Sequence, residues 1–349
     1  MAVAVVVLTA AAATATASAS SGWTVQATPN PGSRNVLQAV SCISATACTA
    51  VGFADNHSLA ERWDGASWTA QTTINPKSRV DLYAVSCVSS TACTAVGSAG
   101  SGTVAEHWNG TRWFVQPTPS LGSGGDLKGV SCTSSSLCTA VGTVGASAGL
   151  VERFTGTKWT VQSTPSLSGQ HVYLQGVSCT SATACIAVGY SSAGVSNNEA
   201  LAEQWNGSTW TILLDANPSG ATASGLRSVS CTSSIACTAV GNEALLGNAA
   251  LFVPLAERWN GTNWTVQPTP NRPPSGGTLV GVSCASATAC TAVATGFAEE
   301  WDGTNWTVQT TATVTGGSGL VGVSCTSATA CEAVGAGGKT LHTLAEQHS

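Results

Sequence analysis

One stretch of sequence, Val40–Gln71, recurs until the chain ends, and it constrains the fold more than any other feature. Its first half reads V-S-C-x5-C-x-A-V-G and occurs seven times with small changes. Its second half reads L-A-E-R-W, then Asn-Gly or Asp-Gly, then W-T-V-Q. Successive first cysteines are 41–53 residues apart, which matches the length of one β-propeller blade. A repeat that fills the chain indicates one closed repeat domain.

Each unit reads as four short antiparallel strands. Strand a is L-x-x-V-S-C, strand b is C-x-A-V-G, strand c is L-A-E-R-W and strand d is W-T-V-Q. The Asn-Gly and Asp-Gly pairs between strands c and d favour positive φ and are a strong hairpin signal. They place the two tryptophans of a unit, such as Trp63 and Trp68, opposite each other. Strands a and b carry almost no charge, so we expect them to be buried on both faces.

The two ends of the chain each hold part of a unit. Trp23–Gln26 is a strand d with nothing before it, and 320–347 has strands a to c without a strand d. Four-stranded units arranged radially make a β-propeller, and pairing the two ends would cover an open edge. The sequence therefore predicts an all-β, seven-bladed propeller over 21–349, with the N-terminal strand completing the last blade.

The cysteines support this reading. All 14 fall into C-x5-C pairs, and a hairpin across each loop would bring the two residues opposite each other. Zinc is the competing interpretation, but it favours closer spacings and needs four ligands at each site. We predict these disulfides: Cys42–Cys48, Cys87–Cys93, Cys132–Cys138, Cys179–Cys185, Cys231–Cys237, Cys284–Cys290 and Cys325–Cys331.

The first 20 residues resemble a targeting segment. An apolar run leads into A-x-A sequences at 15–19, so we interpret 1–20 as a secretory signal peptide and expect a secreted, extracellular protein. A membrane anchor is the alternative, but the apolar run is shorter than the ~20 residues that span a bilayer. With a net charge of −5 and no Lys/Arg cluster, nucleic acid and membrane insertion are not expected.

The order A-V-G, an aromatic strand, N/D-G-x-x-W and a Pro-rich link resembles kelch-type and galactose-oxidase-like propellers, in the style of exported bacterial proteins. The resemblance covers 22–347 and implies the fold rather than an activity. The chain departs from it by having one glycine where kelch repeats carry two, as at Gly52, and Ala294 in the sixth unit. A copper centre of the galactose-oxidase kind is not expected, since every cysteine has a nearer partner than the three tyrosines.

The charged residues of the repeat do not form a catalytic signature. Strand c carries one glutamate in each unit, for which we predict a structural role, accepting hydrogen bonds from backbone or tryptophan N–H groups. These are Glu61, Glu106, Glu152, Glu203, Glu257, Glu299 and Glu346. His107 is expected to be a solvated strand residue, and His57 is a weak metal-ligand candidate. No cofactor is expected.

Loop lengths divide the molecule into two faces. The disulfide face carries the a–b and c–d turns, which are nearly uniform. The variable face carries the b–c and d–a connections, which differ between units, and binding residues favour such loops. The b–c loops at 190–200 and 242–254 are long and should form a wall, with a gap at the short sixth loop. The candidate ligand-binding residues are Arg34, Asp55, His57, Arg79, Asn198, Glu243 and Phe252.

Two functions follow from these features. The first is a non-catalytic binding module, expected to be a monomer, that recognises a glycan or a protein at or outside the cell surface. The second is an exported hydrolase or lyase on a propeller scaffold. A cluster of acidic, basic and histidine residues on the variable face would favour the enzyme, and the sequence offers mainly Arg34, Asp55, His57, Arg79 and Asp81.

Overall fold

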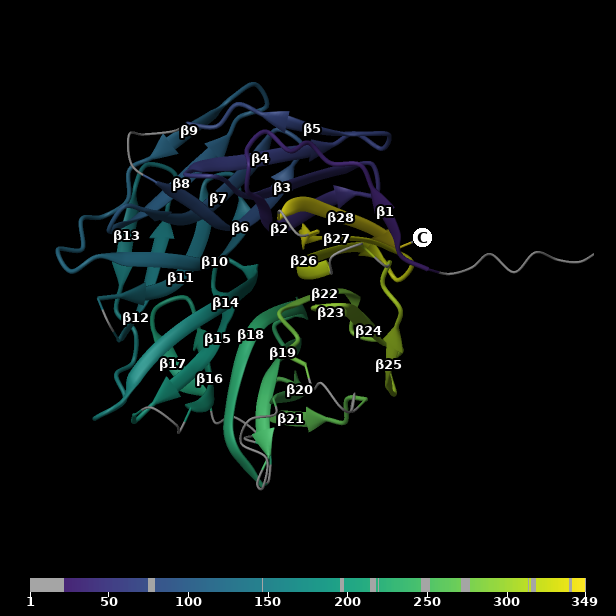
Figure 1. Cartoon of the computed structure of the whole chain (residues 1–349). Helices are drawn as coiled ribbons and strands as arrows, with labels where there is room; N and C mark the ends of the chain where they lie inside the picture. Colours follow the sequence, from purple (N-terminus) through teal and green to yellow (C-terminus); the bar gives the residue numbers. More distant parts are fainter. Residues whose placement is uncertain are drawn as a thin grey trace, which may run out of the picture.

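The computed structural model describes residues 22–74, 79–145, 147–194, 198–213, 218, 220–245, 252–270, 277–312, 314, 318–338 and 341–348. These residues form seven four-stranded antiparallel sheets, arranged in a ring around a central channel (Figure 1). The described part of the chain contains no helix that could span a membrane. The prediction of an all-β, seven-bladed propeller is confirmed. The predicted signal peptide at 1–20 and its boundary with the propeller lie outside the described residues and stay predictions.

The first four blades follow one another along the chain. Blade one contains β2 (Asn35–Ser44), β3 (Ala47–Ala54), β4 (His57–Trp63) and β5 (Trp68–Gln71), and blade two contains β6 (Val80–Ser89), β7 (Ala92–Ala99), β8 (Gly102–Trp108) and β9 (Trp113–Gln116). Blade three contains β10 (Gly125–Ser134), β11 (Leu137–Val144), β12 (Ala148–Phe154) and β13 (Trp159–Gln162), and blade four contains β14 (His171–Ser181), β15 (Ala184–Ser192), β16 (Asn198–Trp205) and β17 (Trp210–Leu213).

The last three blades complete the ring. Blade five contains β18 (Ala221–Ser233), β19 (Ala236–Leu245), β20 (Phe252–Trp259) and β21 (Trp264–Gln267), and blade six contains β22 (Gly281–Ser286), β23 (Ala289–Ala294), β24 (Phe297–Trp301) and β25 (Trp306–Gln309). Blade seven contains β26 (Ser318–Ser327), β27 (Ala330–Gly337), β28 (His342–His348) and, as its outer strand, β1 (Thr24–Gln26).

The ring closes as the two incomplete repeats predicted. β1 pairs antiparallel with β28, with Thr24 opposite Gln347 and Gln26 opposite Ala345. Trp23 is only 5% exposed and belongs to a core cluster with residues of blades six and seven. Figure 1 shows the purple N-terminal strand beside the yellow C-terminal blade. The seventh blade is therefore built from both ends of the chain.

All seven predicted disulfides are present, and the described residues include no free cysteine. Each joins facing residues of strands a and b, as at Cys42 and Cys48, with Cα atoms 3.9–4.0 Å apart. The predicted aromatic pairs also form across the c–d turns. The ring centroids of Trp63 and Trp68 are 5.8 Å apart, and those of Phe154 and Trp159 are 5.5 Å apart.

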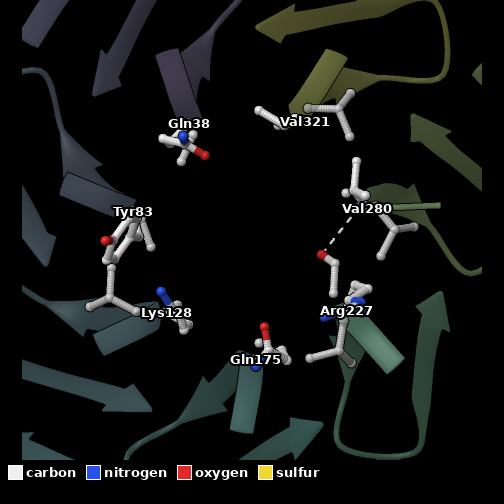
Figure 2. Close-up of a pocket in the computed structure, with 18 of the residues that line it drawn as sticks. Gln38, Tyr83, Lys128, Gln175, Arg227, Val280 and Val321 are labelled. Atoms are coloured by element: carbon white, nitrogen blue, oxygen red, sulfur yellow. Dashed lines mark hydrogen bonds between the residues drawn. The ribbon is translucent and has the colours of Figure 1, made fainter. Parts of the chain in front are cut away.

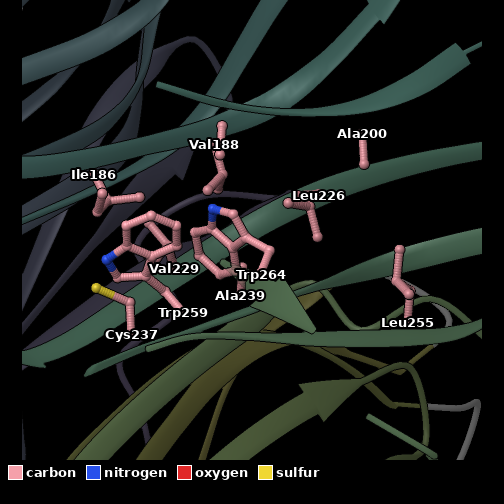
Figure 3. Close-up of a cluster of buried hydrophobic side chains, with 11 residues drawn as sticks. Ile186, Val188, Ala200, Leu226, Val229, Cys237, Ala239, Leu255, Trp259 and Trp264 are labelled. Atoms are coloured by element: carbon pink, nitrogen blue, oxygen red, sulfur yellow. The ribbon is translucent and has the colours of Figure 1, made fainter. Parts of the chain in front are cut away.

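The hydrophobic core lies mainly between neighbouring blades rather than within one. In the cluster of Figure 3, Ile186 and Val188 of blade four pack with Leu226, Trp259 and Trp264 of blade five. A single sheet cannot bury both of its faces, so each blade is stabilised by its neighbours. This arrangement accounts for the uncharged strands a and b.

A hydrogen bond between neighbouring blades accounts for the serine of V-S-C. The backbone N–H of Cys87 donates to Ser41 Oγ of the preceding blade, at 3.0 Å, and the same bond recurs at every boundary. The bond from Cys42 to Ser324 Oγ, at 2.9 Å, joins the first and last blades. The serine thus satisfies a backbone group that the strand ladder leaves unpaired.

The glycine of A-V-G permits a close backbone contact. A Cβ atom built on Gly52 would lie 1.9 Å from the carbonyl oxygen of Val36, and the equivalent glycines of the other blades are as crowded. Blade six carries Ala294 at this position, and its strand a, β22, has six residues where the corresponding β2 has ten. The extra methyl group is incompatible with the long pairing seen elsewhere, so strand a starts later there.

Candidate functional site at the central channel

The inner strand of each blade lines the central channel with three residues, of which the first varies between blades, the second is small and the third is the valine of V-S-C. In six blades strands a and b carry a register shift after the first conserved leucine, so that the residue after Leu37, Gln38, has no partner opposite it. A β-bulge of this kind redirects a side chain. The seven channel residues at this position are Gln38, Tyr83, Lys128, Gln175, Arg227, Val280 and Val321.

These side chains surround a cavity of about 520 Å³ on the axis of the ring (Figure 2). The next residue of each strand is small, because the inner strands come very close. A Cβ atom on Gly322 would lie 2.9 Å from the Cα atom of Ala39 in the neighbouring blade. Strand a starts at the variable face, and the bulge falls in its first half, so the channel residues lie toward the variable face.

The channel lining is chemically asymmetric. Figure 2 shows Tyr83 and Lys128 on neighbouring strands, with Val280 and Val321 across the channel. Lys128 Nζ lies 2.9 Å from Asp126 Oδ2 and 3.7 Å from the centroid of the Tyr83 ring. The guanidinium carbon of Arg227 lies 5.5 Å from the centroid of the Tyr190 ring, which stacks on Tyr173. One arc therefore offers cations, aromatic rings and amides, and blades six and seven offer aliphatic side chains.

Three of the predicted residues, Arg34, Asp55 and Arg79, are brought to one corner of the variable face. The guanidinium carbons of Arg34 and Arg79 lie 5.3 and 5.7 Å from the centroid of the Phe53 ring. The Asp55 carboxylate accepts hydrogen bonds from the Ser33 hydroxyl, at 2.7 Å, and from backbone N–H groups of Ser33 and Arg34. These bonds, that of the Ser33 hydroxyl first, lower the pKa of Asp55. Asp55 thus braces the loop.

The remaining predicted residues lie in separate places. His57 is exposed at the start of β4 and pairs with Ala54, and Arg79 Nε is bonded to Asp81 at 2.8 Å. Asn198 pairs with Ser192 in blade four, while Glu243 and Phe252 belong to strands b and c of blade five. Much of the predicted wall is thus an extension of paired strands. Its tips, 195–197 and 246–251, lie outside the described residues. A binding role for these seven residues stays a prediction.

The strand-c glutamates are buried, and two of them accept the predicted backbone hydrogen bonds. Glu106 accepts from the Ser58 hydroxyl, at 3.2 Å, and from the backbone of Ile74, and Glu346 accepts from the N–H of Ala312, at 3.0 Å. Tryptophan N–H groups instead donate to loop carbonyls, as from Trp63 to Ala45, and to strand-d glutamines, as from Trp113 to Gln71. The predicted backbone donors are therefore confirmed for Glu106 and Glu346, while the indole N–H groups of Trp63 and Trp113 have other acceptors.

Proline in the d–a links explains why some of these carboxylates lack a backbone donor. Ile74 and Ala312 are each the third residue after strand d, and Pro29 and Pro165 hold the equivalent places before Glu61 and Glu203. Proline has no N–H to donate. Neither oxygen of Glu61 or Glu203 has a hydrogen-bond partner among the described residues. Burial raises the pKa of Glu61 to about 8 and that of Glu203 to about 7.

No cluster of three or more potential metal ligands occurs among the described residues. His107, expected to be solvated, is buried with 9% of its surface exposed, so that prediction is wrong. Its Nδ1 lies 3.1 Å from the Thr94 hydroxyl, and its ring contacts Phe114. The channel residues are not among those predicted from the sequence. The available signal was the variable position between the conserved leucine and V-S-C.

Comparison with known proteins supports the fold. No protein-family model and no curated protein sequence matches the chain. The solved structure of YCF48 bound to a D1 peptide is 12% identical, covers 93% of this chain and 96% of its own, and has a TM-score of 0.62. YCF48 from Cyanidioschyzon merolae is 15% identical, with coverages of 94% and 99% and a TM-score of 0.60.

A GH74 xyloglucanase from Xanthomonas campestris is also similar, with 12% identity and a TM-score of 0.60. The match covers 89% of this chain and 52% of the xyloglucanase, so the chain spans about half of that enzyme. At these identities the likeness shows the seven-bladed propeller and does not carry an activity. The kelch-type and galactose-oxidase-like assignment stays a prediction.

Proposed function

We propose that this chain is an exported, monomeric binding protein without catalytic activity, and that it holds its ligand at the variable-face mouth of the central channel. The observation that carries the proposal is the asymmetric ring of channel residues. A concave site with a few convergent polar groups beside apolar ones is typical of ligand recognition. Seven intramolecular disulfides support export, because such bonds persist in oxidising compartments.

The chemistry of the ring favours a peptide over a neutral glycan. Lys128 and Arg227 would attract a carboxylate, and charge-assisted hydrogen bonds to carboxylates are among the stronger ones. Val280 and Val321 would contact an aliphatic side chain of the same segment. The propeller of YCF48 was solved with a bound peptide, which supports a protein ligand here as an analogy of fold. An acidic peptide segment with aliphatic residues is therefore the proposed ligand class.

The alternative, an exported hydrolase or lyase, is favoured less by the channel. Acid–base hydrolysis commonly uses two carboxyl groups that both reach the substrate. The carboxylate nearest the channel residues, Asp126, is held by Lys128 at 2.9 Å. The likeness to a xyloglucanase concerns the fold, so it does not supply the missing residues.

Binding of short peptides to the purified, oxidised protein tests the proposal. We expect peptides with acidic and aliphatic residues to bind. The same peptides with their carboxylates converted to amides should bind weakly. Replacing both cations, Lys128→Met with Arg227→Met, should weaken binding by about 100-fold or more, since each charged contact is worth roughly 1.5–3 kcal/mol. Lys158→Met, an exposed lysine beside the c–d turn of blade three, is the matched control. Unchanged affinity in the double variant, or selective binding of oligosaccharides, would contradict the proposal.

A further inference from the structure

Three of the boundaries between blades are closed by an arginine of strand c. The Arg62 guanidinium donates to the carbonyl oxygen of Ser90 in the next blade, at 2.6 Å, and its central carbon lies 5.3 Å from the centroid of the Trp108 ring. Two further sets repeat this clamp: Arg153 with Ala182 and Trp205, and Arg258 with Ala287 and Trp301. A guanidinium thus fills the same interblade position, against a ring and a carbonyl.

The boundary between blades two and three lacks this clamp. His107 replaces the arginine, and Phe154 replaces the tryptophan of the next blade. In blade two the tryptophan N–H of Trp108 also donates to the Ser90 carbonyl, whereas phenylalanine has no N–H group. Among the described residues, no side chain donates to the equivalent carbonyl, that of Ser135. At the boundary between blades one and two, two side chains donate to the Ser90 carbonyl. At the boundary between blades two and three, the equivalent Ser135 carbonyl has no such donor among the described residues.

A cavity of about 320 Å³ occupies this boundary, at the outer part of the disulfide face. Its lining includes His107, Phe114, Phe154, Ser135 and Thr157. The His107 ring lies 5.3 Å from that of Phe114, edge to face, and Thr94 occupies its Nδ1. Burial lowers the pKa of His107, so the imidazole is neutral near pH 7. The cavity therefore combines aromatic surface and a carbonyl acceptor with no fixed positive charge.

We propose that this cavity, defined by His107, Phe114, Ser135 and Phe154, is a binding site for an arginine side chain of a partner protein. The incoming guanidinium would stack on the Phe154 ring and donate to the Ser135 carbonyl, as the protein's own arginines do at the other boundaries. A planar guanidinium stacks and donates in directions that a lysine ammonium does not match. An aromatic side chain would leave the carbonyl without a donor.

This site lies on the disulfide face and uses none of the channel residues, so it stands or fails independently of the proposed function. The residues that create it are the exceptions to the repeat in this region. Phe114 takes the place of the threonine that follows the tryptophan of strand d in the other blades, and Thr155-Gly156 replaces the usual Asn-Gly or Asp-Gly. These four departures from the repeat, His107, Phe114, Phe154 and Thr155, lie at one boundary, where a cavity is present.

NMR titration of the isotopically labelled, oxidised protein tests the site with N-acetyl-L-arginine amide as the probe. We expect saturable shifts of the His107 and Phe154 ring signals. The neutral analogue N-acetyl-L-citrulline amide should bind on the order of 10-fold more weakly, because it lacks the charge that stabilises stacking and hydrogen bonding. Equal shifts with citrulline, or tighter binding of N-acetyl-L-tryptophan amide, would overturn the assignment.

The variant His107→Arg gives a second test, because it should fill the cavity from within the chain. We expect a folded protein of equal or higher melting temperature that no longer binds the arginine probe. Gln204→Arg is the matched control, since it adds an arginine at the corresponding position of the boundary between blades four and five and should leave binding unchanged. Retained probe binding in a folded His107→Arg protein would overturn the proposal.

Discussion

Two positions of the same inner strand, three residues apart, differ in how far their residue varies between the repeats. Ser41 contacts the next blade through the N–H of Cys87, and a serine stands there in every repeat. Gln38 faces the channel, and its position is held by glutamine, tyrosine, lysine, arginine or valine. Each boundary between blades packs the same two surfaces together, so the same serine contact recurs. The channel is one shared space, so its seven residues can differ and act together on a single ligand.

We expect the largest effect of losing boundary contacts at blade seven, where these contacts join the N-terminal and C-terminal strands. Deleting residues 22–28 removes β1 and the buried Trp23. Loss of a buried tryptophan alone costs about 3–5 kcal/mol, and the exposed edge of β28 adds to this. We expect the free energy of unfolding, measured with guanidinium, to fall by about 5 kcal/mol or more.

Val25→Ala is the control for this deletion, because Val25 lies on the same strand with 52% of its surface exposed. It should change stability by less than about 0.5 kcal/mol. An unchanged unfolding midpoint in the deletion variant would show that ring closure by β1 contributes little.

The strand-c glutamate is the same residue in every blade, but its hydrogen-bond partners differ between blades. Glu61 provides a test of this difference. Its folded pKa is about 8, raised from 4.5 by burial. The unfolded carboxyl ionises first as pH rises, so the stability conferred by the neutral side chain is complete below pH 4.5 and is lost toward pH 8. The loss is on the order of several kcal/mol, at 1.36 kcal/mol per pKa unit. Glu61→Gln should make this fall in unfolding free energy smaller by the Glu61 contribution, while the other buried glutamates, such as Glu203, continue to contribute.

Thermal or guanidinium unfolding at several pH values between 4 and 9 measures the effect. Glu199→Gln, at an exposed position of blade four, should keep the slope of the parent protein. If Glu61→Gln and the parent protein lose stability in parallel across this range, the buried carboxyl is not the group that titrates.

The smallest expected change in stability compares Ser41 and Gln38 directly. Ser41→Ala leaves the backbone N–H of Cys87 without its acceptor and should cost about 1–2 kcal/mol in unfolding free energy. Gln38→Ala removes a half-buried channel side chain and should cost less than about 0.5 kcal/mol. Equal losses in denaturant unfolding of the two variants would contradict the division between boundary and channel positions.

Much of the fold could be predicted because the same pattern of strands and turns occurs in seven repeats. The C-x5-C spacing gave the disulfides, and the incomplete units at Trp23–Gln26 and 320–347 gave the ring closure. These features depend on local spacing and on pairing that each unit specifies alone. The burial of His107 could not be read from its strand alone, because the side chains that contact its ring, Thr94 and Phe114, come from the two neighbouring strands.

The candidate site was harder to predict for a similar reason. A strand of strict alternation gives no indication that Gln38 turns toward the axis, since the bulge depends on how strands a and b are paired. The hydrogen bonding of the buried glutamates also depends on a distant residue. Whether Glu61 receives a backbone donor is decided by Pro29 in the link that follows another blade's strand.

The pairing of β1 with β28 also sets an order of events during synthesis. Thr24 and Gln347, which share a hydrogen bond, are 323 residues apart in sequence. Each disulfide, in contrast, spans only six positions, so its hairpin can form as soon as it emerges. Contacts between distant residues form slowly, after local ones. β1 must therefore stay unpaired until β28 has been made, and we expect the ring to close after the local hairpins have formed.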